Sequence, residues 1–178
     1  MPMEHKAFLL DYDEFTATLA PILFTSLANS DIQPLVQYIE ENRAHLTDPD
    51  MGDPLGSRWM DLIEPVDTHQ LGDVALTRFY SPMETIGLDY EWEAALEAVR
   101  RDVGENAEAI VLGEPFGPSS HPFDPGKMGS YFRSWATVHR QRAAVAQVLK
   151  GHHSDAIAAV EHLLGRPDDA RLGLFVTF

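Results

Sequence analysis

The chain has 178 residues, of which 44% are hydrophobic and 23% are charged, an ordinary composition for one globular domain of about 100–200 residues. Its 28 acidic and 13 basic residues give a net charge of −15, which argues against binding of duplex nucleic acid. The absence of cysteine excludes thiol catalysis, disulfides and Cys-ligated zinc, and no stretch approaches the ~20 apolar residues of a membrane span.

The first forty residues predict a strand followed by two helices. Residues 6–10 form a short apolar run that suits a strand. Acidic residues then open a helix over 11–29, which Pro21 should kink or end, because proline lacks an amide donor. A second helix is predicted over 31–43. The apolar run is too short for a signal peptide, so we expect a cytoplasmic protein.

A loop and an ambiguous segment follow. Residues 47–56 are acids and turn-forming residues and predict a loop. Residues 67–80 fit either an alternating strand or a helix capped by Asp67, and we favour the helix although Gly72 weakens it. A strong helix is predicted over 89–103, where apolar residues recur at helical spacing before Gly104.

The second half predicts a long loop between regular elements. Residues 109–112 are a buried-strand candidate. Residues 113–130 hold too many glycines and prolines for a regular element, and loops of this length are usually functional or mobile. Phe116 and Phe123 within this loop argue that it packs against the core. Helices are then predicted over 131–150 and 154–164.

These patterns predict one helix-rich α+β domain over residues 1–178. It would have about six helices and a small sheet of three or four short strands. The last strand, over 172–178, is expected to pair with residues 6–10, which would bring the chain ends together.

Charge is distributed unevenly along the chain. Residues 1–89 carry 16 acidic and 4 basic residues, whereas residues 90–178 carry 12 and 9. The stretch 125–154 has no acidic residue at all. It contains five basic ones: Lys127, Arg133, Arg140, Arg142 and Lys150. One interpretation is that the acidic part covers this basic helix; the other is that the helix helps to bind an anion.

Asp11-Tyr12-Asp13, directly after an apolar run, resembles the first motif of haloacid-dehalogenase-like phosphatases. In that family the first carboxylate attacks phosphorus and the second moves a proton, and Asp168-Asp169 resembles the family's acidic magnesium motif. The family pattern has Thr or Val where this chain has Phe15, and the parallel strand–helix alternation is absent between residues 12 and 105. We therefore assign the chain to no family.

Possible metal ligands do not have the spacing of known sites. Asp48, Asp50 and Asp53 superficially resemble a calcium loop, but Gly52 precedes the third acid instead of following it. Histidines occur at 152, 153 and 162, but no pair stands four residues apart on a helix. We expect no metal site and no cofactor.

The acidic first part favours a macromolecule-binding protein that docks a basic partner, as immunity-type, antitoxin-type or adaptor proteins do. Complementary charge would steer the two together. The partner-binding surface is predicted to include five acidic residues: Glu40, Glu41, Asp48, Asp50 and Asp53. The sequence does not indicate the oligomeric state, and no membrane partner is expected.

The alternative is a small-ligand protein or an enzyme that uses loop 113–130 against the helix 131–150. Basic side chains would hold an anionic ligand, and a loop residue would handle protons. The ligand-binding residues would be His121, Asp124, Lys127, Arg133, His139 and Arg140. No spacing in the chain identifies a catalytic set, so the sequence alone leaves open whether it is an enzyme.

Overall fold

A computed structural model describes residues 3–104, 106–126, 128–150, 155–165 and 169–178. Within them lie seven α-helices: α1 (Tyr12–Asn29), α2 (Gln33–Asn42), α3 (Thr68–Leu76), α4 (Trp92–Asp102), α5 (Ala107–Val111), α6 (Trp135–Leu149) and α7 (Asp155–Leu164). There are also two 3-10 helices, η1 (Arg43–His45) and η2 (Trp59–Leu62), and four strands, β1 (Lys6–Asp11), β2 (Glu114–Pro115), β3 (Ser130–Ser134) and β4 (Leu172–Thr177). The predicted helix-rich α+β class is confirmed.

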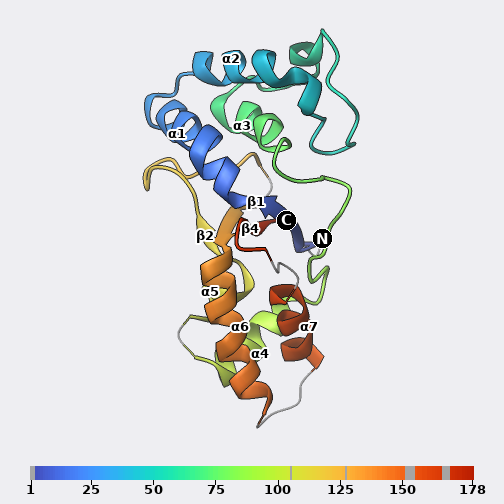
Figure 1. Cartoon of the computed structure of the whole chain (residues 1–178), viewed down its shortest axis with the longest axis vertical. Helices are drawn as coiled ribbons and strands as arrows, with labels where there is room; N and C mark the ends of the chain where they lie inside the picture. Colours follow the sequence, from blue (N-terminus) through green and yellow to red (C-terminus); the bar gives the residue numbers. More distant parts are fainter. Residues whose placement is uncertain (1–2, 105, 127, 151–154, 166–168) are drawn as a thin grey trace.

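The four strands form one antiparallel sheet in the order β1-β4-β3-β2. The predicted pairing of the first and last strands is confirmed, with Phe8 opposite Phe175, and the two chain ends lie close together (Figure 1). Residues 86–89 cover the outer edge of β1 through hydrogen bonds such as Ile86 N to Ala7 O, 2.7 Å. This cover protects an edge that could otherwise pair with another chain.

The sheet lies between two layers of helices (Figure 1). On one face α1 packs against the sheet, and α2 and α3 pack with α1 to complete the core that Phe8, Phe132 and Phe175 enter. Helices α4 to α7 cover the other face, against Leu174 and Val176. Because both faces are buried, β1 and β4 have almost continuous apolar sequences.

Two helix predictions were tested directly. Residues 67–80 contain α3, and Asp67 caps it by accepting a hydrogen bond from the amide of Gln70 at 2.8 Å. The expectation that Pro21 could end the first helix was wrong. Helix α1 runs through Pro21 for 18 residues, with Leu19 and Leu23 buried on either side of it.

The predicted strand over Ala109–Leu112 was wrong, because these residues belong mainly to the short helix α5. The last carbonyl groups of α5 are satisfied by distant side chains. Gln141 donates to the carbonyl of residue 109 at 2.9 Å, Arg133 to that of residue 110, and His5 Nε2 to that of residue 111 at 3.0 Å. These tertiary hydrogen bonds occupy acceptors that a helix end leaves unpaired.

The predicted helix over 131–150 begins later than expected. Residues 131–134 belong to β3, and α6 starts at Trp135 with Ser134 as its cap, whose hydroxyl accepts from the amide of Thr137. The predicted helix over 154–164 corresponds to α7, although residue 154 lies outside the described residues.

The prediction that residues 113–130 hold no regular element was wrong at both ends, because Glu114–Pro115 form β2 and Ser130 begins β3. The described part of the loop between them packs against the α1–α3 side of the sheet, as its phenylalanines predicted. Phe123 is buried, and its amide donates to the carbonyl of Phe116 at 2.7 Å. The ring of Phe116 lies edge-on to those of Phe15 and Phe132. Within the described residues, no helix is both long enough and apolar enough to cross a membrane.

Candidate functional site

A hollow of about 430 Å³ lies between the segment 46–64 and helix α3. Its buried and half-buried lining is largely apolar and includes Leu55, Trp59, Ile63 and Val74. The exposed residues on its rim include Asp50, Met51, Asp53, Leu62 and Glu64. We call this hollow and its rim the acidic groove.

A tight turn at Asp48 shapes one wall of the acidic groove. The carboxylate of Asp48 accepts hydrogen bonds from the amides of Asp50 (2.8 Å) and Met51 (2.7 Å). The backbone closes the turn between Asp48 N and the carbonyl of Asp53 at 2.8 Å, and Gly52 adopts the positive φ of +73° that this turn requires. The turn projects Met51 outward, with 69% of its surface exposed.

Trp59 anchors the opposite part of the segment. Its side chain is buried, and its indole Nε1 donates to Glu40 Oε1 at 2.6 Å. Glu40 also lies 3.7 Å from the guanidinium of Arg43. Glu40 was predicted to bind a partner, and the structure gives its carboxylate the additional role of attaching the segment to α2.

Hydrogen bonds link the start of the segment 46–64 to the end of α3. The amide of Thr47 donates to the hydroxyl of Thr77 at 3.1 Å, and that hydroxyl donates to the carbonyl of Val74 at 2.7 Å. These hydrogen bonds fix the start of the segment beside α3. The groove is therefore built on a helix, although most of its lining comes from a loop.

The groove carries excess negative charge. The segment 46–64 contains five acidic residues and one basic residue, Arg58, which pairs with Asp61 at 2.7 Å. Of the predicted partner-binding residues, Asp48, Asp50 and Asp53 line the groove. Glu40 and Glu41 lie outside its lining on α2, where the carboxylate of Glu41 accepts from Gln37 at 2.9 Å.

Further exposed apolar side chains lie at the same groove. Leu62, which lines it, is 81% exposed, and Met83 is 67% exposed. The side chain of Met83 lies beside Gly52, where an added Cβ would come within 2.8 Å of its Cγ. Neither the groove nor this patch was predicted from sequence, because apolar residues of a loop show no periodicity.

The structure corrects the place of Arg133. It lies on strand β3 with 2% of its surface exposed, and its guanidinium donates to the carbonyls of Ile110 and Val111. Burial disfavours the charged form and lowers the pKa of the guanidinium. The prediction that Arg133 shares an exposed helix face with His139 and Arg140 was therefore wrong.

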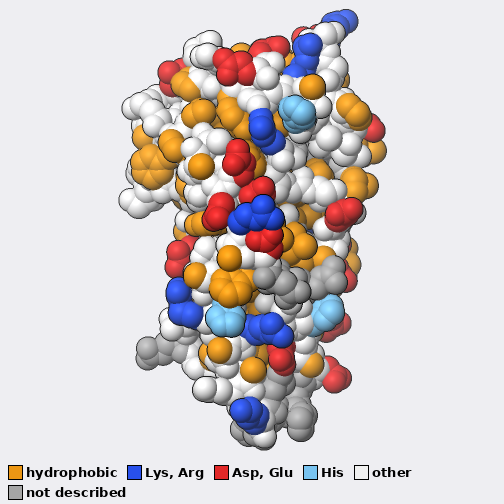
Figure 2. Space-filling model, viewed as in Figure 1, with side chains coloured by type: hydrophobic (Ala, Val, Ile, Leu, Met, Phe, Trp, Pro, Cys, Tyr) orange, Lys and Arg blue, Asp and Glu red, His pale blue; other side chains and the backbone are white. Residues whose placement is uncertain are grey.

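His139 and Arg140 are exposed on α6, in the other helical layer from loop 113–130. The ring of His139 stacks on Trp135 with centroids 4.8 Å apart. Arg140 donates to the hydroxyl of Thr137 at 3.2 Å. Figure 2 shows blue and pale-blue side chains along α6, and red ones over α2 and at the start of α1.

The loop residues of the alternative site lie on the α1–α3 side. His121 contacts the hydroxyl of Ser120 at 3.0 Å, and the amide of Asp124 donates to His69 Nδ1 at 3.1 Å. Lys127 lies outside the described residues. The described members of this set are therefore not brought together into one site.

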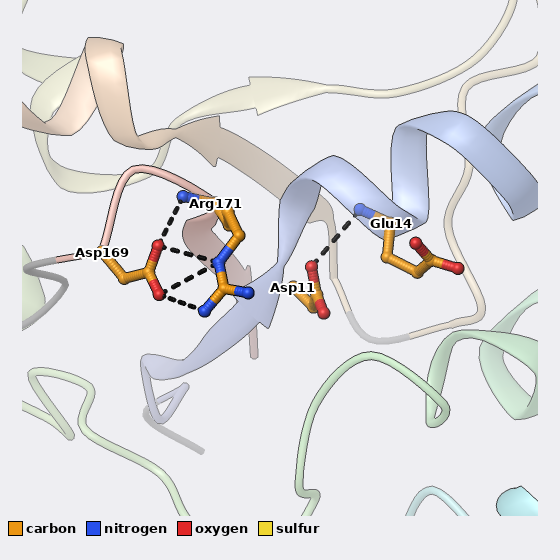
Figure 3. Close-up of polar contacts among 4 residues, drawn as sticks. All are labelled: Asp11, Glu14, Asp169 and Arg171. Atoms are coloured by element: carbon orange, nitrogen blue, oxygen red, sulfur yellow. Dashed lines mark hydrogen bonds and ion pairs between the residues drawn. The ribbon is translucent and has the colours of Figure 1, made fainter.

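A second polar cluster contains Asp11 and Asp169, two of the acidic residues of the phosphatase-like motifs (Figure 3); Asp168 lies outside the described residues. Asp11 caps α1 by accepting from the amide of Glu14, 3.3 Å. Asp169 accepts from the guanidinium of Arg171, which lowers the pKa of Asp169 to about 2. The charges of Asp11 and Asp13, together with the stronger effect of Asp169, raise the pKa of Arg171.

This cluster has the geometry of a helix cap and an ion pair. The antiparallel sheet also differs from the parallel sheet that the phosphatase resemblance implies. Within the described ranges, no group of three or more His, Asp or Glu side chains is arranged to hold a metal ion. Comparison with protein families, curated proteins and solved structures finds no match. Any proposal about function therefore rests on the sequence and the geometry of this chain.

Proposed function

We propose that the chain is a macromolecule-binding protein, of the immunity, antitoxin or adaptor type, that docks a basic partner on the acidic groove. The observation that carries this proposal is the gathering of Asp48, Asp50 and Asp53 around a concave apolar surface. A concave surface with exposed apolar residues and a charged rim is typical of an interaction site.

The placement of the basic residues supports the proposal. Arg140 and Arg142 are exposed on α6, in the layer on the far side of the sheet from the groove. In the acidic first part, Arg43 pairs with Glu40 and Arg58 with Asp61, three residues apart in each case. Such local pairs leave a net negative rim that can steer a basic partner.

The test is a titration with a short synthetic peptide of Lys and Ser, at low and high salt. The groove triple variant replaces Asp50 and Asp53 by Asn and Glu64 by Gln, and leaves Asp48 and Glu40 to their structural roles. The control triple variant replaces Glu91, Glu93 and Glu97 by Gln. All three are exposed in the other layer: Glu91 directly precedes α4, and Glu93 and Glu97 lie on it.

Both triple variants lose the same charge, so a difference between them reports position. We expect the groove triple variant to weaken binding on the order of tenfold at low salt, because it removes three negative charges that face the basic peptide. Tenfold weaker binding corresponds to a loss of about 1.4 kcal/mol in binding free energy. The control should remain within about twofold, and added salt should weaken wild-type binding. Equal effects of the two triples, or binding indifferent to salt, would refute the proposal.

A further inference from the structure

We infer that the acidic groove accepts an apolar side chain from its partner, presented on a short segment in which Lys or Arg residues flank that side chain. This inference rests on the proposed function and specifies the chemistry of the partner. It follows from three features of the groove: an apolar interior, exposed apolar residues at the mouth and an acidic rim.

The interior of the groove provides a site for an apolar anchor. Trp59 and Val74 are almost completely buried, with 2% and 4% of their surfaces exposed, and Leu55 and Ile63 are half-buried around them. The hollow of about 430 Å³ lies within the range of about 300–1,000 Å³ that is typical of ligand pockets. A large apolar side chain placed there would lose its contact with water on several sides.

The mouth of the groove offers adaptable apolar contacts. Met51 and Leu62 line the hollow and are 69% and 81% exposed, and Met83 is exposed next to Gly52. Methionine side chains are flexible and polarisable, and they recur at surfaces that bind amphipathic segments. These residues can cover an inserted side chain from above while the interior contacts it from below.

The rim selects the charge of the residues beside the anchor. Asp53 and Glu64 are exposed at the groove, and the carboxylate of Asp48 lies in its wall. The segment 46–64 contains no Lys, and the guanidinium of its single Arg58 is paired with Asp61. A segment with acidic flanks would be repelled, whereas Lys or Arg flanks would form ion pairs with the rim.

The experiment compares two peptides of equal charge. The first is the Lys/Ser peptide, and the second has one central Ser replaced by Leu. Binding is measured with wild-type chain and with Met51→Ser and Leu62→Ser. Met128→Ser and Tyr90→Ser are matched controls, because Met128 and Tyr90 are 67% and 59% exposed and do not line the groove.

We expect the Leu-containing peptide to bind wild-type chain on the order of tenfold more tightly, from burial of one apolar side chain. Met51→Ser and Leu62→Ser should each remove several-fold of that advantage and leave the affinity for the Lys/Ser peptide within about twofold. The two control variants should retain the advantage. Circular dichroism of each variant establishes that the fold is unchanged.

Two results would overturn the inference. If both peptides bind equally and the Met51 and Leu62 variants have no effect, the groove acts through charge alone, and the proposed function stands without this inference. If wild-type chain self-associates in light scattering and Leu62→Ser abolishes the self-association, the occupant is a second copy of this chain. Failure of both peptides to bind at low salt would instead refute the proposed function.

Discussion

His5 is the residue whose chemistry has the clearest consequence for stability. Its ring is buried; Nε2 donates to the carbonyl of Val111, and Nδ1 accepts from the amide of Leu88 at 3.0 Å. Burial is the main cause that lowers the pKa of His5 to about 4, and the charge of Arg133 adds to the effect. The hydrogen bond to Val111 and the carboxylate of Asp89 act in the opposite direction.

Replacement of His5 therefore predicts a change in the pH dependence of unfolding. As pH falls from 6.5 to about 4, an unfolded His5 binds a proton that the folded residue excludes. The unfolding free energy should fall across this window by up to about 3 kcal/mol, at about 1.4 kcal/mol per pKa unit. His5→Gln keeps one donor and one acceptor. It should reduce the slope of the unfolding free energy against pH between about pH 4 and 6.5, as measured by urea denaturation at several pH values.

His45→Gln is the control, because His45 is exposed on η1. The slope should remain that of wild type in this variant. If His5→Gln and His45→Gln have the same slope, the account of His5 as a buried neutral ring is wrong.

Some residue roles were predictable and others were not. Asp67 was predicted as a helix cap because an acidic residue before a helical pattern can accept from the first free amides. Arg133 was placed on a helix, because a fully buried arginine is uncommon and its acceptors lie more than twenty residues away. Only the folded structure brings the end of α5 to this guanidinium.

At the scale of elements, the sheet depends on a glycine near the start of β4. Gly173 pairs with Leu10 on one side and Ser134 on the other. An added Cβ at Gly173 would lie 2.1 Å from the carbonyl oxygen of Arg133, so one of the two backbones would have to move. Glycine permits the close approach of β3 and β4.

We expect Gly173→Ala to lower the unfolding free energy by about 1–3 kcal/mol, the usual cost of overpacking. Gly56→Ala is the control, since no atom lies within 4 Å of the added Cβ. There alanine should be neutral or slightly stabilising, because it restricts the unfolded chain. If the two variants unfold at the same denaturant concentration, the close approach of β3 and β4 does not require glycine at position 173.

The errors in element prediction have physical causes. Residues 109–112 were predicted as a strand because a short apolar run has no period that separates strand from helix. Helix α5 is instead stabilised at its end by Gln141, Arg133 and His5, none of which is local. For β3, Phe132 fits the helical spacing of the following stripe, and the capping position of Ser134 was the available signal that the helix begins later.

At the scale of the whole molecule, the class and the pairing of the chain ends could be predicted, because they depend on apolar periodicity and on two strong strands. Charge composition also drew attention to Asp48, Asp50 and Asp53. The groove that these residues line could not be predicted, since it depends on how Trp59 and Thr47 attach an irregular segment to α2 and α3.

Mapping the docking surface by NMR tests the central claim most directly. Backbone amide shifts are recorded as the Leu-containing Lys peptide is added to wild-type chain at low salt. We predict that the largest changes fall in residues 48–64 and 70–74, with little change in α4 or α6. Changes centred on α6 or on loop 113–130, with the acidic groove unperturbed, would contradict the account.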